Sequence, residues 1–231
     1  MLSPHKIIYG STRPIISWES IDTVLVDMDG TLLDLAFDNF FWHEIVPSCY
    51  AKKHGVSEGH ARTELLGRYK ALEGCLAWYC IDHWSKDLGL DIRALKREHR
   101  HLIRFLPGTI DFLASVRKRD KRLLLVTNAH PDTLAIKIDQ TRLDQHVNAL
   151  VSSHEFRSPK ETQEFWERFH ADERFDPLCT ILIDDSVPVL QAASEFGVGS
   201  VVGIRRPDSR HPPRPIHHFP AVDGVCELTG G

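Results

Sequence analysis

Residues 23–34 read TVLVDMDGTLLD, an apolar run that ends abruptly in two aspartates, a glycine and a threonine. A short apolar run bounded by polar turn residues is typical of a buried strand. Asp27 and Asp29 leave this strand at positions i and i+2, and Gly30 permits the turn that brings both carboxylates toward one ligand. The stretch therefore predicts a strand whose carboxyl end carries a polar site.

Further strand-like runs follow along the chain, separated by helical stretches. These runs are residues 122–127 (RLLLVT), 149–152 (ALVS), 180–184 (TILID) and 200–204 (SVVGI). Pro107, Pro131 and Pro159 stand near the expected starts of the helices between them, where proline is well tolerated. Strands that alternate with helices predict an α/β protein with a Rossmann-like, doubly wound parallel sheet.

The segment between the first two runs, residues 35–106, shows helical periodicity and no convincing strand. One apolar repeat recurs every fourth residue from Leu76 to Leu88, and another spans Ile92 to Leu106 in steps of three and four. The segment is therefore predicted to be an inserted helical domain, with residues 1–34 and 107–231 forming the sheet domain. Its many aromatic rings are expected to fill mainly its own core. The proline-rich chain after Arg205 is expected to wrap the surface.

Composition narrows the class of partner and the compartment. Lys and Arg total 28 against 32 Asp and Glu, and the net charge of -4 gives no electrostatic case for nucleic acid or an acidic membrane surface. No apolar run reaches the ~20 residues of a membrane span, and residues 1–16 lack the apolar core of a signal peptide. The five scattered cysteines predict reduced thiols, and the 14 histidines show no metal-site spacing. We expect a cytoplasmic protein with a small-molecule partner.

Polar residues stand at the ends of the predicted strands. They are Asp27 and Asp29 after the first run, Thr127 and Asn128 at the second, Lys160 shortly after the third, and Asp184 and Asp185 at the fourth. Open parallel sheets bind ligands at the carboxyl ends of their strands, so these side chains are expected to meet at one edge.

Their chemistry suggests what that edge binds. Three or four carboxylates in one small volume repel one another unless a cation lies among them. Ligands that are all oxygen suit Mg²⁺ better than zinc or copper. Lys160, the Thr127 hydroxyl and backbone N–H groups near Asn128 supply the surroundings that an anion requires. The edge is predicted to bind magnesium and phosphate.

These clusters, in this order, resemble the four motifs of the haloacid dehalogenase superfamily. The matching stretches are residues 27–34, 126–128, 159–160 and 183–186. The resemblance implies a Rossmann-like sheet with a helical C1-type cap at residues 35–106. It also implies that Asp27 is the nucleophile that forms an aspartyl-phosphate and that Asp29 is the general acid and base. Mg²⁺ would be held by Asp27, the Asp29 carbonyl oxygen and Asp185, with Asp184 in its inner or outer ligand sphere.

Other activities of this superfamily fit the same residues less well than phosphate hydrolysis does. Dehalogenases of the superfamily lack the second aspartate, so Asp29 favours phosphoryl transfer over halide displacement. A phosphomutase would also carry Asp29, but nothing in the insertion suggests a sugar phosphate held in two orientations. A binding protein that kept the fold and lost turnover is the remote alternative, because the residues expected for catalysis are all present.

Stretches outside these motifs resemble the bacterial GMP/IMP 5′-nucleotidase family. They are residues 27–42, 78–84 (WYCIDHW), 127–131 (TNAHP), Gly203 and residues 207–209. The resemblance implies hydrolysis of purine nucleoside monophosphates, with Phe37, Trp42 or Trp78 as candidate rings to stack on the base, Trp42 first and Trp78 second. Another small metabolite, such as a sugar phosphate or phosphoglycolate, is the alternative substrate. Neither the oligomeric state nor the preferred base is indicated.

Overall fold

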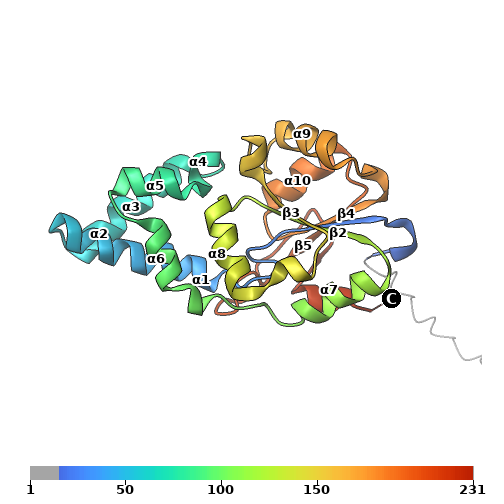
Figure 1. Ribbon diagram of the computed structural model, residues 1–231, viewed down its shortest axis with the longest axis horizontal. Coiled ribbons are helices and arrows are strands. Elements are labelled where there is room, and N and C mark those ends of the chain that lie inside the picture. Colours follow the sequence, from blue (N-terminus) through green and yellow to red (C-terminus); the bar gives the residue numbers. More distant parts are fainter. Residues whose placement is uncertain (1–15, 231) are drawn as a thin grey trace, which may run out of the picture.

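The computed structural model describes residues 16–230, and the expectation for the extreme N-terminus lies outside this range. The chain forms a parallel six-stranded sheet in the order β3-β2-β1-β4-β5-β6 (Figure 1). The strands are β1 Thr23–Val26, β2 Arg122–Thr127, β3 Ala149–Ser152, β4 Thr180–Asp184, β5 Ser200–Ile204 and β6 Ala221–Val222. All five predicted runs are strands, and the predicted Rossmann-like, doubly wound sheet is confirmed.

The strand register explains why polar side chains meet at one edge. Val26, the last residue of β1, lies opposite Leu125 of β2 and Ile183 of β4. The next residue, Asp27, donates its backbone N–H to the carbonyl of Ile183 at 2.9 Å. Because the three central strands end nearly level, the residues that follow them share one edge of the sheet.

Helices cover both faces of the sheet. The helices α9 (Gln163–Glu173) and α10 (Val187–Phe196) lie on one face, and α7 (Thr109–Lys118) lies on the other (Figure 1). The helix α8 (Pro131–Thr141) begins at its proline as predicted. The helix expected to open at Pro159 begins instead at Gln163, because the Thr162 hydroxyl caps it by accepting from the Phe165 N–H. Lys160 is thereby left in the loop before the helix.

The segment between β1 and β2 is helical, as predicted, and is called the cap below. Its elements are α1 Ala36–Phe40, a π-helical turn Phe41–Ile45, α2 Val46–His54, α3 Glu58–Leu72, α4 Leu76–Tyr79, α5 Ile81–Leu88, α6 Ile92–Glu98 and a 3-10 turn Arg100–Leu102. Figure 1 shows the cap on one side of the sheet. Leu33 and Phe105 form an antiparallel bridge where the chain enters and leaves it. The two connections to the sheet are therefore held together.

Two features of the cap differ from the helices that its apolar repeats predict. The repeat from Leu76 to Leu88 does not form one helix, because Cys80 adopts an extended conformation between α4 and α5. The second repeat ends before Leu106, whose backbone N–H instead donates to the carbonyl of Leu32. Most cap rings pack together as expected, with Trp84 buried at the centre of the group.

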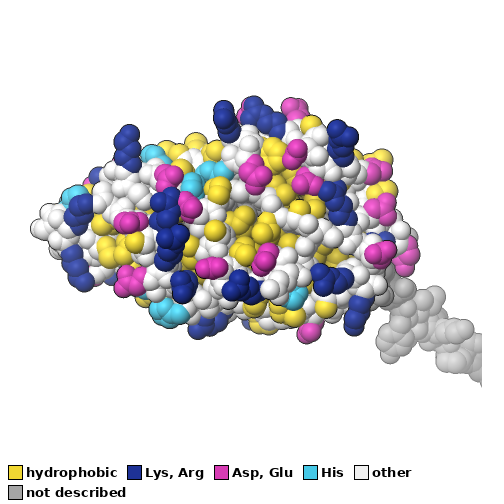
Figure 2. All heavy atoms as spheres, in the orientation of Figure 1, with side chains coloured by type: hydrophobic (Ala, Val, Ile, Leu, Met, Phe, Trp, Pro, Cys, Tyr) yellow, Lys and Arg dark blue, Asp and Glu magenta, His cyan; other side chains and the backbone are white. Residues whose placement is uncertain are grey.

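The proline-rich tail only partly wraps the surface. Residues 209–215 are exposed, but Ala221–Val222 adds a sixth strand, and Val225 and Leu228 are buried. The tail returns to the core because apolar residues follow its last proline, Pro220. Figure 2 shows charged side chains of both signs interspersed on the displayed face. Within residues 16–230 no helix has the length and apolar character needed to cross a membrane.

Candidate active site

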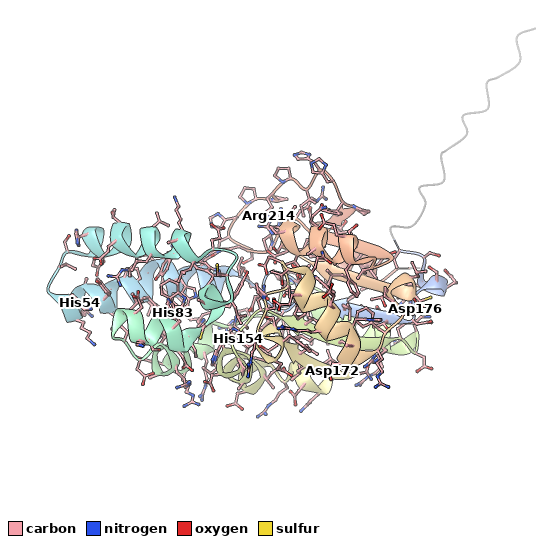
Figure 3. All side chains as sticks on the ribbon, turned by 90° about the horizontal axis from the view of Figure 1, so that it is seen from above. His54, His83, His154, Asp172, Asp176 and Arg214 are labelled. Atoms are coloured by element: carbon pink, nitrogen blue, oxygen red, sulfur yellow. The ribbon has the colours of Figure 1, made fainter. Side chains whose placement is uncertain are left out.

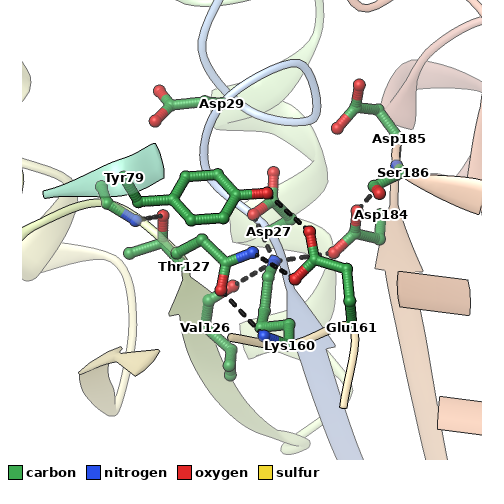
Figure 4. Close-up of polar contacts among 12 residues, drawn as sticks. Asp27, Asp29, Tyr79, Val126, Thr127, Lys160, Glu161, Asp184, Asp185 and Ser186 are labelled. Atoms are coloured by element: carbon green, nitrogen blue, oxygen red, sulfur yellow. Dashed lines mark hydrogen bonds and ion pairs between the residues drawn. The ribbon is translucent and has the colours of Figure 1, made fainter. Parts of the chain in front are cut away.

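Lys160 and two aspartates form the buried centre of the site (Figure 4). The Lys160 Nζ donates to Asp27 Oδ1 at 2.5 Å, to Asp184 Oδ2 at 2.7 Å and to the backbone carbonyl of Val126 at 2.9 Å. Lys160, Asp27 and Asp184 are all at most 5% exposed. Burial alone would lower the pKa of Lys160, but Asp184 and Asp27 outweigh it and hold that pKa above its ordinary value. Lys160 is therefore charged at the expected position.

A third carboxylate completes an oxygen-only cluster. Oxygen atoms of Asp27, Asp184 and Asp185 lie within 4.8 Å of one another. Burial raises the pKa of Asp27 well above its ordinary value, and burial together with the charge of Asp184 raises the pKa of Asp185 to about 7. The Lys160 ammonium and the Arg214 guanidinium beside Asp185 carry two positive charges against three carboxylates. The donor set fits a hard divalent cation, which would supply the missing positive charge.

Gly30 is required by the close packing around this cluster. It has a positive φ of 88°, and a Cβ added there would lie 2.8 Å from the Asp185 Cγ. The predicted turn at Gly30 is therefore present. Arg214, which sequence reasoning missed, places its Nη2 2.7 Å from Asp185 Oδ2. Only the approach of the exposed tail to the sheet edge brings this arginine to the site.

Asp29 lies on the same cavity but belongs to a second charged network. The Lys137 Nζ lies 2.6 Å from Asp29 Oδ1 and 2.6 Å from Asp38 Oδ2, and the Lys96 Nζ lies 2.9 Å from Asp38 Oδ1. Both lysines are at most 2% exposed. Burial would raise the pKa of Asp38, but Lys137 and Lys96 outweigh it and hold that pKa below its usual range. The network joins α6 and α1 of the cap to α8 and to the loop after β1.

Sequence reasoning did not assign Lys137, Lys96 or Asp38 to the site. A usable signal existed for Lys137, because it lies in the apolar stretch LAIKI at residues 134–138. A lysine on the buried face of a helix requires a partner. Lys96 stands among other basic residues in the stretch 93–104 (RALKREHRHLIR), where a lysine is ordinarily solvated.

Thr127 and Asn128 lie at the site, and their side chains are engaged within it. The Thr127 Oγ1 accepts from the Ala129 N–H at 3.0 Å. The Asn128 Oδ1 accepts from the Lys160 N–H at 2.9 Å, and its Nδ2 donates to Glu161 Oε2 at 2.9 Å. The Asn128 amide thus ties the loop after β2 to the loop that carries Lys160.

A residue of the cap also reaches this loop. The Tyr79 hydroxyl donates to Glu161 Oε1 at 2.5 Å (Figure 4), and burial is the main cause that raises the pKa of Tyr79 above its usual range. Both residues were missed by sequence reasoning, although Tyr79 lies in the quoted stretch 78–84 and Glu161 directly follows Lys160. Together they close one side of the cavity.

A cavity of about 980 Å³ lies between the cap and the sheet edge. Asp27, Asp29 and Lys160 line its core side, whereas Trp42 and Trp78 line its cap side. Both tryptophans also pack in the aromatic group of the cap, with ring centroids 6.0 Å and 6.1 Å from that of Trp84. The predicted catalytic and base-stacking residues therefore face one space, which is large enough for a ligand of nucleotide size.

This fold and this site define the class of protein. Residues 21–197 match the family of haloacid dehalogenase-like hydrolases, and the chain belongs to this family. Over 213 residues, 92% of this chain and 96% of the relative, it is 40% identical to the GMP/IMP nucleotidase YrfG of Escherichia coli (strain K12). The resemblance inferred from the motifs is confirmed.

Solved structures support the fold. A HAD phosphatase from Thermococcus onnurineus superposes with a TM-score of 0.76 at 20% identity, covering 90% of this chain and 96% of that one. The L-2-haloacid dehalogenase from Xanthobacter autotrophicus gives a TM-score of 0.62 at 15% identity, covering 90% and 97%. At these identities the structures show a common fold and no common substrate.

Proposed function

We propose that this hydrolase removes the phosphate of purine nucleoside 5′-monophosphates, GMP and IMP in particular, with Mg²⁺ as its cofactor. The observation that carries the proposal is the cavity of about 980 Å³, which has the Asp27 cluster on one wall and indole rings on the other. A phosphate ester placed between them would meet carboxylate chemistry at one end and aromatic surfaces at the other. The kinship to a GMP/IMP nucleotidase supports the same choice of substrate.

In this proposal a carboxylate oxygen of Asp27 attacks the phosphorus atom. The bond between phosphorus and the ribose oxygen breaks, and the nucleoside departs with that oxygen. The resulting aspartyl-phosphate is then hydrolysed by water, which splits one difficult displacement into two easier ones. Lys160, bound to Asp27 and Asp184, orients the nucleophile and supplies positive charge next to the phosphoryl oxygens. Asp27, Asp184 and Asp185 would hold Mg²⁺ together with the Asp29 carbonyl oxygen, and the bound ion would keep Asp27 ionised.

Asp29 is proposed to donate a proton to the leaving oxygen and to take one from the attacking water. Its carboxylate lines the cavity and is oriented by the Lys137 ammonium at 2.6 Å. Thr127 and backbone N–H groups near Asn128 are proposed to contact the phosphate.

Residues 35–106 are proposed to form the cap domain, and residues 1–34 and 107–231 to form the core domain. The five free thiols support the proposal that the protein is located in the cytoplasm.

Lys137→Met tests the assignment of Asp29. The variant removes the ammonium that orients Asp29, so hydrolysis of IMP should slow by ~10²-fold or more, within the range of general acid–base catalysis. The p-nitrophenolate group leaves without a proton, so p-nitrophenyl phosphate should lose less than about 10-fold. Release of inosine or p-nitrophenol in a single turnover with excess enzyme provides the comparison, because it reports departure of the leaving group before water attacks the aspartyl-phosphate.

Lys96→Met is the matched control, because it removes a buried ammonium that contacts Asp38 and not Asp29. Its effect on the two substrates should be equal. If Lys137→Met also slows both substrates equally, Lys137 supports the fold and does not position Asp29.

The substrate proposal is tested by a screen of phosphate monoesters with Mg²⁺. Phosphate release should show the highest kcat/KM for GMP and IMP. A higher value for a sugar phosphate or for phosphoglycolate would reject the purine assignment and leave the phosphohydrolase mechanism in place. Conversion of a sugar phosphate to its isomer would indicate a phosphomutase.

Trp42→Ala tests base stacking in the cap. Loss of a stacked ring costs ~1–3 kcal/mol elsewhere, so KM for GMP or IMP should rise by roughly 5- to 150-fold. Hydrolysis of p-nitrophenyl phosphate, which lacks a purine, should stay nearly unchanged. Phe40→Ala is the control, because Phe40 lies on the same cap segment, is 39% exposed and does not line the cavity. Equal losses on both substrates for Trp42→Ala would make Trp42 a packing residue, with Trp78 the next to test.

A further inference from the structure

A second group of metal-binding side chains lies where the cap meets the core. Ligand atoms of Cys80, His130 and His154 all lie within 4.8 Å of one another. Cys80 comes from the break between α4 and α5, His130 directly precedes α8, and His154 lies in the 3-10 turn Ser153–Phe156 after β3. Figure 3 shows His154 between the helices of the cap and those of the core. Histidine spacing gave no sign of this group, because its members come from three separate segments.

His154 is already arranged as a ligand. Its Nε2 is buried and has no hydrogen-bond partner. Buried polar atoms ordinarily have a partner, and a metal ion bound at this nitrogen would supply one.

His130 has a carboxylate beside each ring nitrogen. Its Nε2 lies 3.6 Å from Asp82 Oδ2, and its Nδ1 lies 3.7 Å from Asp132 Oδ2. The Nδ1 also accepts from the Asp132 N–H at 3.2 Å. Nδ1 therefore carries the lone pair of the neutral ring, and an ion bound there would replace the contact with the Asp132 N–H while Asp82 holds the proton on Nε2. Arg93 pairs with both Asp82 and Asp132, so one positive charge partly offsets these two carboxylates.

The ligand chemistry selects a different ion from that of the active site. One thiolate and two imidazoles suit zinc, whereas Mg²⁺ prefers ligands that are all oxygen. We propose that Cys80, His130 and His154 bind a zinc ion that joins the cap to the core. Asp82 or a water molecule would complete the tetrahedral set, since three protein ligands leave one position open.

The site uses residues that the proposed hydrolysis leaves without a role. Cys80 lies in the stretch 78–84 and His130 in the stretch 127–131, the two cap and core segments that resemble nucleotidases. Cys80 follows Tyr79, which closes the substrate cavity, and His130 follows Ala129, which lines it. A bound zinc ion would thus fasten both sides of the cavity entrance.

The test is zinc titration of the reduced full-length chain against a chromophoric chelator, with Mg²⁺ in large excess to occupy the carboxylate cluster. Wild type should bind one zinc ion per chain. Cys80→Ser and His154→Gln should each weaken binding by more than ~100-fold, because loss of an outer partner alone costs ~10- to 100-fold. Cys179→Ser is the matched control, a partly buried free thiol just before β4, and should bind zinc as wild type does.

Cobalt substitution distinguishes this site from the carboxylate cluster. Co²⁺ bound to wild type should give the near-ultraviolet charge-transfer band of a thiolate ligand, and Cys80→Ser should lose that band. Zinc should also raise the Tm of wild type and of Cys179→Ser but not that of Cys80→Ser. Circular dichroism verifies that each variant folds. If Cys80→Ser does not fold, Cys80→Ala replaces it. Zinc binding of equal strength in wild type and Cys80→Ser, no zinc binding, or Co²⁺ binding without the thiolate band would overturn the proposal.

Discussion

Asp27→Asn should lower phosphate release from GMP by on the order of 10⁴-fold or more, because the substitution removes the attacking oxygen anion. Asparagine is nearly isosteric with aspartate, and its carbonyl oxygen can still accept the hydrogen bond that Lys160 Nζ donates to Asp27 Oδ1. The loss should therefore appear in kcat while the fold is retained. Steady-state phosphate release and thermal unfolding of both proteins provide the measurement.

Asp34→Asn is the control for this prediction. Asp34 Oδ1 accepts from the backbone N–H groups of Ala36 and Ser209, both at 3.0 Å. Asparagine can make the same contacts, so activity should stay within a few-fold of wild type. Near-normal turnover by Asp27→Asn would exclude a nucleophilic role for Asp27.

Removing divalent cations should abolish hydrolysis, and adding Mg²⁺ should restore it. Asp27, Asp184 and Asp185 lie within 4.8 Å of one another, and burial raises the pKa of both Asp27 and Asp185. Without a cation the charged form of the nucleophile is therefore disfavoured, which weakens attack on phosphorus. Activity measured in a chelator, followed by titration with Mg²⁺, tests this expectation.

Asp185→Ala tests the proposed magnesium site at a single ligand. It removes one anionic oxygen ligand, so the Mg²⁺ concentration needed for half-maximal activity should rise steeply. Asp172→Ala, an exposed site on α9, should leave that concentration unchanged. Full activity without any divalent cation would mean that the carboxylate cluster serves another purpose.

The sheet and the centre of the site could be predicted from sequence for one physical reason. Buried parallel strands are short apolar runs, and the residues that follow them meet at one edge. Asp27, Asp184 and Asp185 therefore came together as expected, and Lys160 lies within hydrogen-bonding distance of Asp27 and Asp184. The sixth strand was missed because Ala221–Val222 is too short to show a periodicity.

The surroundings of the site could not be predicted in the same way. Lys137, Tyr79 and Arg214 come from a sheet-covering helix, a cap helix and the exposed tail, respectively. Local periodicity says which face of a helix is buried but not which distant element it meets. The helix break at Cys80 illustrates the same limit, because the apolar repeat continues through a residue whose backbone is extended.

Covalent labelling of Asp27 during turnover is the most direct test of the central claim. The protein is mixed with GMP and Mg²⁺, quenched in acid at successive short times, digested and analysed by mass spectrometry. We expect the peptide that contains Asp27 to carry one phosphoryl group in the wild type and none in Asp27→Asn. A phosphoryl group on another side chain, or phosphate release without a phosphorylated peptide at any quench time, would contradict nucleophilic attack by Asp27.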